Sequence, residues 1–224
     1  MSKKKMLILG FGKTISGVIL LSLLLFWPAG TIHYPGAWRL LLIMFAPMLV
    51  LGAFLYYKAP QLLEKRLSTN ESEKEQKVVI LLSCIVFILS FLLCGLDYRY
   101  GWSHVPDWIV IFSCILFLIT YALFAELLRE NEFLSRTVEV QENQTVVSTG
   151  LYGIVRHPMY FIITFMFFSL PLILGSFVGL IPLLGVPLIL VKRIKNEEQV
   201  LEKGLKGYKE YKKKVKYRLI PFVW

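Results

Sequence analysis

The sequence predicts an all-α fold, a polytopic membrane helical bundle with about six transmembrane helices. The last two helices are expected to form a tight hairpin, followed by an amphipathic C-terminal helix. Of the 224 residues, 56% are hydrophobic and sixteen are phenylalanine, a composition typical of membrane proteins. The apolar residues gather in runs close to the ~20 residues that a helix needs to cross the hydrocarbon core.

Four of the predicted spans can be located directly. They cover approximately residues 14–32, 38–57, 78–96 and 107–128. A basic segment precedes the first span and no small-residue cleavage site follows it, so we expect a retained helix and not a cleaved signal peptide. The loop 58–77 is mixed in charge, which favours a helical extension followed by a turn.

The apolar stretch 159–191 predicts the last two helices. It has 33 residues without a charge, too many for one crossing and few for two. Small residues in its middle would let two helix backbones approach closely, so we expect a hairpin that turns near Gly175–Gly179. The preceding connection, 130–149, alternates apolar and polar residues, which favours a short extended or hairpin-like segment.

The basic residues predict the orientation. Five Lys or Arg lie in the loop 58–77, three in the connection 129–156 and eleven in the tail from Lys192. The connections 28–37 and 97–106 contain only one between them. By the positive-inside tendency, both termini lie in the cytoplasm. We expect an integral, multi-pass protein of a prokaryotic plasma membrane.

The remaining composition favours neither a metal, nor a disulfide, nor nucleic acid. The three cysteines fall within apolar runs, where a thiol behaves as a small hydrophobic group. The histidines are scattered and no Cys pair has the spacing of metal ligands. The net charge of +10 indicates membrane topology and contact with anionic lipid, because no folded basic domain with base-reading groups is recognisable.

Two polar clusters flank the predicted hairpin and form the candidate site. The first contains Arg156, His157 and Tyr160 at a helix start, where backbone donors and a fixed cation can bind an anion. The second is the run 193–198 beyond the other arm, which contains one arginine and two adjacent carboxylates. If these carboxylates turn toward the hairpin they need cationic or donor partners, for which the first cluster is the candidate. Interfacial anchoring can also explain the first cluster, and a helix-surface ion pair can explain part of the second.

These motifs, taken in order, resemble those of the isoprenylcysteine carboxyl methyltransferase and phospholipid methyltransferase superfamily of integral membrane enzymes. The residues that carry the resemblance are Gly150, Tyr152, Val155, Arg156, His157, Pro158 and Tyr160, then Arg193, Glu197, Glu198 and Leu201, and finally Gly207, Tyr208, Tyr211, Val215, Arg218, Ile220 and Pro221. They cover roughly residues 146–221, about a third of the chain.

The resemblance implies a methyltransferase that uses S-adenosylmethionine and a lipophilic acceptor, such as an isoprenylcysteine-like carboxylate, a lipid or a thiol. The site residues that it implies are Gly150, Tyr152, His157, Pro158, Tyr160, Glu197 and Glu198 for the cofactor and Arg193 and Arg156 for catalysis. Membrane lipid is the other expected partner. A single membrane domain over 1–224 is implied, with a four-helix part, 1–128, and a cofactor-binding part, 129–224.

Two other functions stay open at the level of sequence. The tail segment 215–221 also fits membrane sterol reductases, which would use NADPH, although those enzymes have more spans and a longer chain. A non-catalytic, lipid-binding membrane protein could retain the same fold. The intact Arg193, Glu197 and Glu198 count against that last possibility.

Overall fold

The computed structural model describes residues 2–67, 74–134 and 138–224, and every regular element within these ranges is a helix. The long helices are α1 (Lys3–Ala29), α2 (Pro35–Lys58), α4 (Lys74–Tyr100), α5 (Asp107–Glu130), α6 (Pro158–Leu174) and α8 (Val186–Gly204). The short ones are α3 (Pro60–Leu67), α7 (Leu180–Leu183), α9 (Tyr208–Lys214) and the 3-10 turn η1 (Gly150–Gly153). The predicted all-α fold is confirmed.

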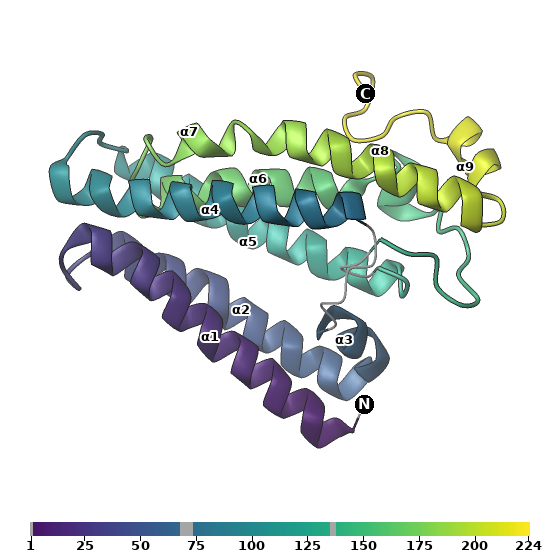
Figure 1. The fold of residues 1–224 in the computed structure, drawn as a ribbon, viewed down its shortest axis with the longest axis horizontal. Coiled ribbons are helices and arrows are strands. Elements are labelled where there is room, and N and C mark those ends of the chain that lie inside the picture. The colour runs from purple at the N-terminus through teal and green to yellow at the C-terminus, as the bar shows by residue number, and fades with distance from the viewer. Residues whose placement is uncertain (1, 68–73, 135–137) are drawn as a thin grey trace.

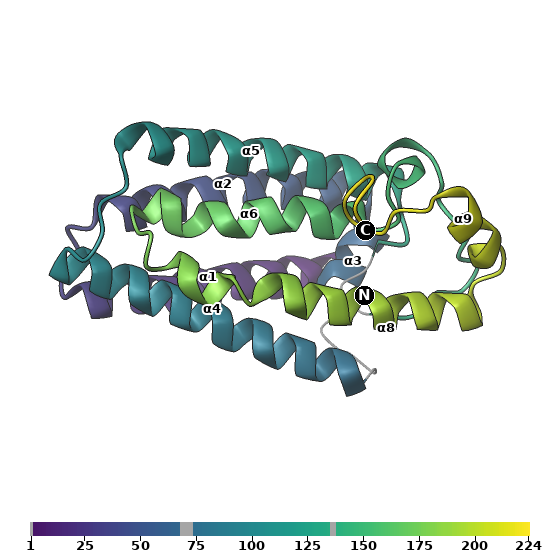
Figure 2. The same ribbon diagram turned by 90° about the horizontal axis from the view of Figure 1, so that it is seen from above.

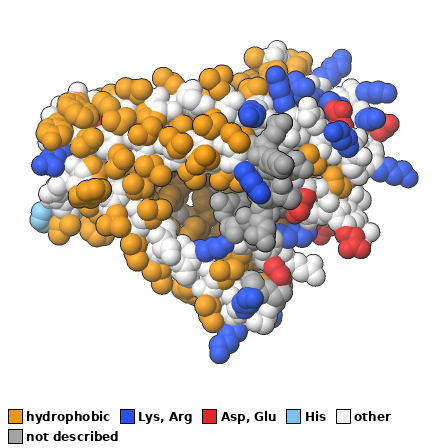
Figure 3. Space-filling view, viewed as in Figure 1, with side chains coloured by type: hydrophobic (Ala, Val, Ile, Leu, Met, Phe, Trp, Pro, Cys, Tyr) orange, Lys and Arg blue, Asp and Glu red, His pale blue; other side chains and the backbone are white. Residues whose placement is uncertain are grey.

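The bundle has the length and surface of a polytopic membrane protein. Helices α1, α2, α4 and α5 are long and apolar enough to cross a membrane, and α6 is a shorter apolar helix of 17 residues. Apolar side chains cover most of the bundle surface in Figure 3, whereas Lys, Arg, Asp and Glu concentrate toward one side of it. Such a continuous apolar exterior fits hydrocarbon and not water.

The first helix begins at Lys3 and not near residue 14 as the hydropathy suggested. The Oγ of Ser2 accepts a hydrogen bond from the amide of Lys5 at 3.3 Å, which caps the helix before its basic residues. The helical extension predicted after α2 is present as α3. The turn predicted around Thr69–Ser72 lies outside the described residues.

Helices α6 and α8 form the predicted hairpin, with α7 in the turn between them, as Figures 1 and 2 show. Helix α6 ends at Gly175, whose φ of 84° is the left-handed conformation that glycine adopts without strain. At Gly179 a Cβ atom would collide with the sulfur of Cys94, so the turn can pack against α4 only with glycine there. The residues that the sequence placed at the turn are therefore confirmed.

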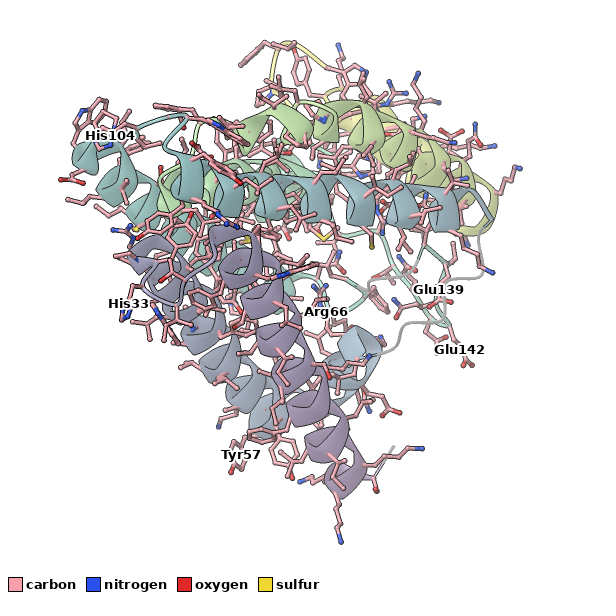
Figure 4. All side chains as sticks on the ribbon, turned by 60° about the vertical axis from the view of Figure 1, so that its left-hand side comes forward. His33, Tyr57, Arg66, His104, Glu139 and Glu142 are labelled. Atoms are coloured by element: carbon pink, nitrogen blue, oxygen red, sulfur yellow. The ribbon has the colours of Figure 1, made fainter. Side chains whose placement is uncertain are left out.

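A buried carboxylate fastens the turn to the neighbouring connection. The two oxygens of Asp97 accept hydrogen bonds from the amide of Ser103 at 2.7 Å and from the hydroxyls of Ser103 and Ser176 at 2.5 Å each. Figure 4 shows His33 and His104 at this end of the bundle, and Glu139 and Glu142 at the other. The connections 28–37 and 97–106 are thus at one end of the bundle and the connection 129–156 is at the other, as expected for segments predicted to lie on opposite sides of the membrane.

The connection before the hairpin forms no pair of strands in its described part. Its described part, residues 138–149, is irregular and turns at Asn143, which has a φ of 58°. The predicted strand-like alternation instead serves packing, because Val140 and Val146 lie against the buried face of the tail. No ladder partner is available in the described ranges, and the segment stays extended without becoming a sheet.

The C-terminal amphipathic helix is present but short. It is interrupted between Gly204 and Gly207, so only the seven residues of α9 are helical beyond α8. Its apolar side chains, Tyr208 and Tyr211, are buried inside the protein. Because that face packs on the protein, α9 itself offers only its lysine-rich face to a membrane surface, whereas Phe222 and Val223 beyond it are exposed.

The arrangement of the connections predicts which positions a reagent can reach. In a variant without native cysteines, His104→Cys should react with a membrane-impermeant maleimide added to intact cells, since its connection is predicted to lie outside. Glu142→Cys should react only after the membrane is permeabilised, because its connection is predicted to be cytoplasmic. Labelling of both positions in intact cells would contradict the predicted topology.

Candidate functional site

The loop 154–157 between η1 and α6, here called the motif loop, packs against the tail of the chain. The amide of Arg156 donates to the carbonyl of Tyr217 at 2.9 Å, and the amide of His157 donates to the carbonyl of Arg218 at 2.8 Å. Pro158 then begins α6, where its missing N–H costs no hydrogen bond. Two segments about 60 residues apart in sequence therefore pair at the start of the hairpin.

The carboxylate of Glu198 lies at the centre of this arrangement. Its Oε1 accepts from the Nε of Arg156 at 2.7 Å and lies 3.4 Å from the Nε2 of His157. Its Oε2 accepts from the Nε of Arg218 at 2.9 Å, and the Nζ of Lys212 is 3.7 Å away. Only 3% of Glu198 is exposed. A charge buried to this degree is tolerated because cationic partners satisfy both of its oxygens.

The same contacts fix the ionisation of Glu198. Burial alone would raise its pKa, but the hydrogen bonds from His157, Arg156 and Arg218 outweigh burial and hold the pKa well below its usual range. Glu198 is therefore a carboxylate at every physiological pH.

Arg156 extends the network to the tail backbone. A single NH1 nitrogen of its guanidinium donates to the carbonyls of Val215 and Lys216, at 2.8 Å each. Arg156 is 7% exposed. Arginine suits this position because its planar group can donate to a carboxylate and to carbonyls at once. The predicted catalytic residue Arg156 thus connects the motif loop, α8 and the tail.

A second polar network joins α6, α8 and α4. The hydroxyl of Tyr160 donates to Glu197, and the Nε of Arg193 donates to the same hydroxyl oxygen at 2.9 Å. The NH1 of Arg193 donates to the side-chain oxygen of Gln76 on α4 at 3.0 Å. The predicted residues Arg193, Tyr160 and Glu197 are therefore in direct contact.

A pocket opens between these networks. It encloses about 830 Å³ of atom-free space, a volume that includes solvent in its open mouth. Its walls come from the connection after α5, the motif loop, α8 and the tail. Of the nine predicted site residues, seven line it: Tyr152, Arg156, His157, Pro158, Tyr160, Arg193 and Glu197.

The two remaining predicted residues, Gly150 and Glu198, are not among the pocket-lining residues. Gly150 has a φ of 46°, and a Cβ atom there would collide with the carboxylate of Glu130, so it shapes the backbone that leads to the motif. Adjacent residues on a helix point about 100° apart, which explains why Glu197 faces the pocket while Glu198 faces the tail. Direct contact of these two residues with a cofactor stays a prediction.

The structure also brings residues to the pocket that were not predicted as site residues. They include Asn131, Val146, Leu205, Tyr208 and Tyr211. The hydroxyl of Tyr211 donates to the carbonyl of Tyr152 at 2.7 Å. The buried hydroxyl of Tyr208 has no hydrogen-bond partner within the described part of the chain. Because buried hydroxyls are normally paired, this one marks a position where the pocket can bind a polar ligand atom.

Comparison with known proteins gives two matches. The family model of phospholipid methyltransferases matches residues 108–207, which run from the start of α5 through the hairpin to the end of α8. The chain is also 33% identical over 91 residues to Delta(14)-sterol reductase TM7SF2 of Mus musculus, an alignment that covers 39% of this chain. The chain spans 22% of the length of that curated relative.

The Glu198 network predicts a distinctive pH dependence of stability. Glu198→Gln should lower the free energy of unfolding at neutral pH by about 3 kcal/mol, because it leaves buried cations without their partner. Since the pKa of Glu198 is lowered by folding, its contribution is complete above the ordinary pKa of glutamate, ~4.3, and is lost only as the pH falls further.

Thermal unfolding of both proteins in detergent, followed over a range of pH, measures this difference. Glu126→Gln is a suitable control, because Glu126 pairs with Arg129 on an exposed surface and its loss should have little effect. An equal effect of the two substitutions would show that the buried network contributes nothing special.

Proposed function

We propose that the protein transfers a methyl group from S-adenosylmethionine to a lipophilic acceptor, because the family model of phospholipid methyltransferases matches residues 108–207 and the motifs occur in the order typical of that superfamily. The pocket between the motif loop, α8 and the tail is the proposed site, at the cytoplasmic face of the membrane. The observation that supports the proposal most is the chemical character of the pocket lining, which combines two carboxylates with the rings of four tyrosines and one phenylalanine.

The polar groups of the pocket match those of S-adenosylmethionine. Its amino-acid ammonium and its sulfonium are cations, for which the carboxylate of Glu197 and the rings of Tyr152 and Tyr208 are suitable partners. Its carboxylate would suit His157 and the amides at the start of α6, where the helix dipole favours an anion. The unpaired hydroxyl of Tyr208 is available for a further polar atom of the ligand.

When bound, S-adenosylmethionine supplies an electrophilic methyl group on a sulfonium. The contribution of the protein is then mainly orientation, because methyl transfer requires the nucleophile in line with the bond that breaks. Tyr160 and Arg193 are each held by a neighbour on another helix, so they can act as rigid guides. The tail and the connection 138–147 pack against each other, and both contribute residues to the pocket wall.

The acceptor is proposed to reach Arg193 from the bilayer. In Figure 1, helices α1 and α2 diverge from α4 toward the N-terminus, and Figure 3 shows a hollow with apolar walls in this region. A planar, permanently charged guanidinium suits a carboxylate or an anionic headgroup. An amine acceptor would first have to lose a proton.

A reductase that uses NADPH is the second candidate, and the similarity to the mouse sterol reductase favours it. The pocket lining argues against it. NADPH carries several phosphate charges, which need cationic partners. The lining contains the carboxylates of Glu139 and Glu197. Its two arginines are already engaged: Arg156 donates to Glu198 and the tail backbone, and Arg193 donates to Tyr160 and Gln76.

Titration of the purified protein separately with S-adenosylmethionine and with NADPH distinguishes these functions. We expect calorimetry to detect binding of S-adenosylmethionine and none of NADPH, because the pocket complements a cation better than a polyphosphate. Transfer of a radioactive methyl group should then be assayed with a farnesylated cysteine, phosphatidylethanolamine and a long-chain thiol. Binding of NADPH alone would favour the reductase, and binding of neither would leave a non-catalytic protein.

The unpaired hydroxyl of Tyr208 gives a second test. Tyr208→Phe should weaken binding of S-adenosylmethionine roughly tenfold, the effect of one hydrogen bond of about 1.4 kcal/mol. The same change should leave stability equal or higher, since no protein partner loses a bond.

Tyr211→Phe is the matched control on the same helix. It removes a hydrogen bond to the carbonyl of Tyr152 and should lower stability instead. If Tyr208→Phe destabilised the protein without changing its affinity, the proposed contact would be wrong.

A further inference from the structure

Gln76 lies at the start of α4, outside the family match, and its side chain is completely buried (0% exposed). Its side-chain oxygen accepts from the NH1 of Arg193 at 3.0 Å. Its side-chain nitrogen donates to the side-chain oxygen of Asn196 at 2.6 Å and lies 3.5 Å from the carbonyl oxygen of Arg193. This one amide therefore bridges α4 and α8 beside the pocket.

The direction of each hydrogen bond in this bridge follows from Arg193. A guanidinium can only donate, so the oxygen of the Gln76 amide must face it and the nitrogen must face away. Asn196 then has to present its own oxygen to that nitrogen. The orientation of both amides is thus set by the cation at the pocket wall.

Arg193 is held at two points from two helices. Its Nε donates to the hydroxyl of Tyr160 on α6, and its NH1 donates to Gln76 on α4. Bonds to two separate nitrogens of the guanidinium constrain its plane more than either bond does alone. Because the Tyr160 hydroxyl also donates to Glu197, the position of Arg193 affects the whole second network.

We propose that Gln76 is a positioning residue, which fixes the guanidinium plane of Arg193 for the transfer reaction. The proposal rests on the proposed function, in which Arg193 orients the acceptor. An amide at this place is costly unless all its groups are paired, and an apolar side chain of similar volume would pack α4 against α8 at least as well. The contact with Arg193 is what an apolar side chain cannot supply.

Ser90, a second buried polar residue on α4, bonds to the hairpin without contacting Arg193. The hydroxyl of Ser90 donates to the carbonyl of Gly179 at 2.7 Å, and Ser90 is 1% exposed. It fastens α4 to the hairpin turn, away from the pocket, and belongs to neither network around Arg193. Ser90→Ala is therefore the matched control for loss of a buried hydrogen bond between α4 and the hairpin.

The test compares Gln76→Leu, Gln76→Glu and Ser90→Ala in the full-length protein in nanodiscs. The first readout is the Nε–H signal of Arg193 in nitrogen-15 spectra, assigned by its loss in Arg193→Lys. Gln76→Leu should shift this signal and speed its exchange with water, because the guanidinium loses one attachment. Gln76→Glu keeps an acceptor oxygen and should preserve the slow exchange, and Ser90→Ala should leave the signal unchanged.

The second readout separates binding from turnover. Gln76→Leu should lower kcat by up to about 100-fold, as a misplaced guiding group does, while the affinity for S-adenosylmethionine measured by calorimetry stays the same. Gln76→Glu should restore most of the turnover. Gln76→Asn, which keeps an amide but is one methylene shorter, should behave like the leucine variant and replaces it should that variant not fold.

Two results would overturn the proposal: an unchanged Arg193 signal in both Gln76→Leu and Gln76→Asn, or an equal loss of turnover in Ser90→Ala. If the unsubstituted protein neither binds S-adenosylmethionine nor transfers methyl groups, the proposed function fails. The Arg193 signal decides the positioning role in that case as well, because it requires no bound cofactor.

Discussion

The carboxylate of Glu198 holds three distant segments of the chain together. Arg156 reaches it from the motif loop, Arg218 from the tail, and the carboxylate itself comes from α8. Each wall of the pocket that these segments form depends on that contact. Removing the carboxylate would leave two guanidinium groups facing each other, so the site and the docking of the tail are one structural unit.

The adjacent carboxylates Glu197 and Glu198 face different surroundings, because neighbouring residues on a helix point about 100° apart. Glu198 points to the tail and is neutralised by cations, whereas Glu197 points to the pocket and accepts from Tyr160. The pocket therefore keeps a negative group of its own although three cationic side chains surround Glu198. This separation of charge leaves a carboxylate at the pocket of a largely basic protein, as the proposed cationic ligand requires.

Local patterns in the sequence were sufficient for the helices and the hairpin. Apolar runs predicted the spans, and the glycines around 175–179 predicted the turn, because both depend on neighbouring residues. The roles of Gln76 and Arg218 could not be predicted in this way, since each contacts residues of another segment through a single side chain. A lone uncharged polar residue at the start of an apolar span, such as Gln76, is a weak signal.

The same limit applies to the tail and to the two glutamates. Helical spacing predicted an amphipathic helix but not whether its apolar face would meet lipid or protein, and Tyr208 and Tyr211 are buried in the protein. Sequence order likewise placed Glu197 and Glu198 at the site without indicating which of them faces the pocket. Both questions are decided by packing between segments far apart in the chain.

The contact between Arg156 and Glu198 also has a consequence for biosynthesis. One residue precedes the hairpin and the other lies toward the end of its second helix, so their side chains can meet only if the chain between them has returned to the same face of the bilayer. A hairpin that was inserted as a single crossing would strand the two charges on opposite faces, and the tail could not dock. The ion pair thus distinguishes a correctly inserted chain from a misinserted one, and a chain whose tail has docked has already completed its integration into the membrane.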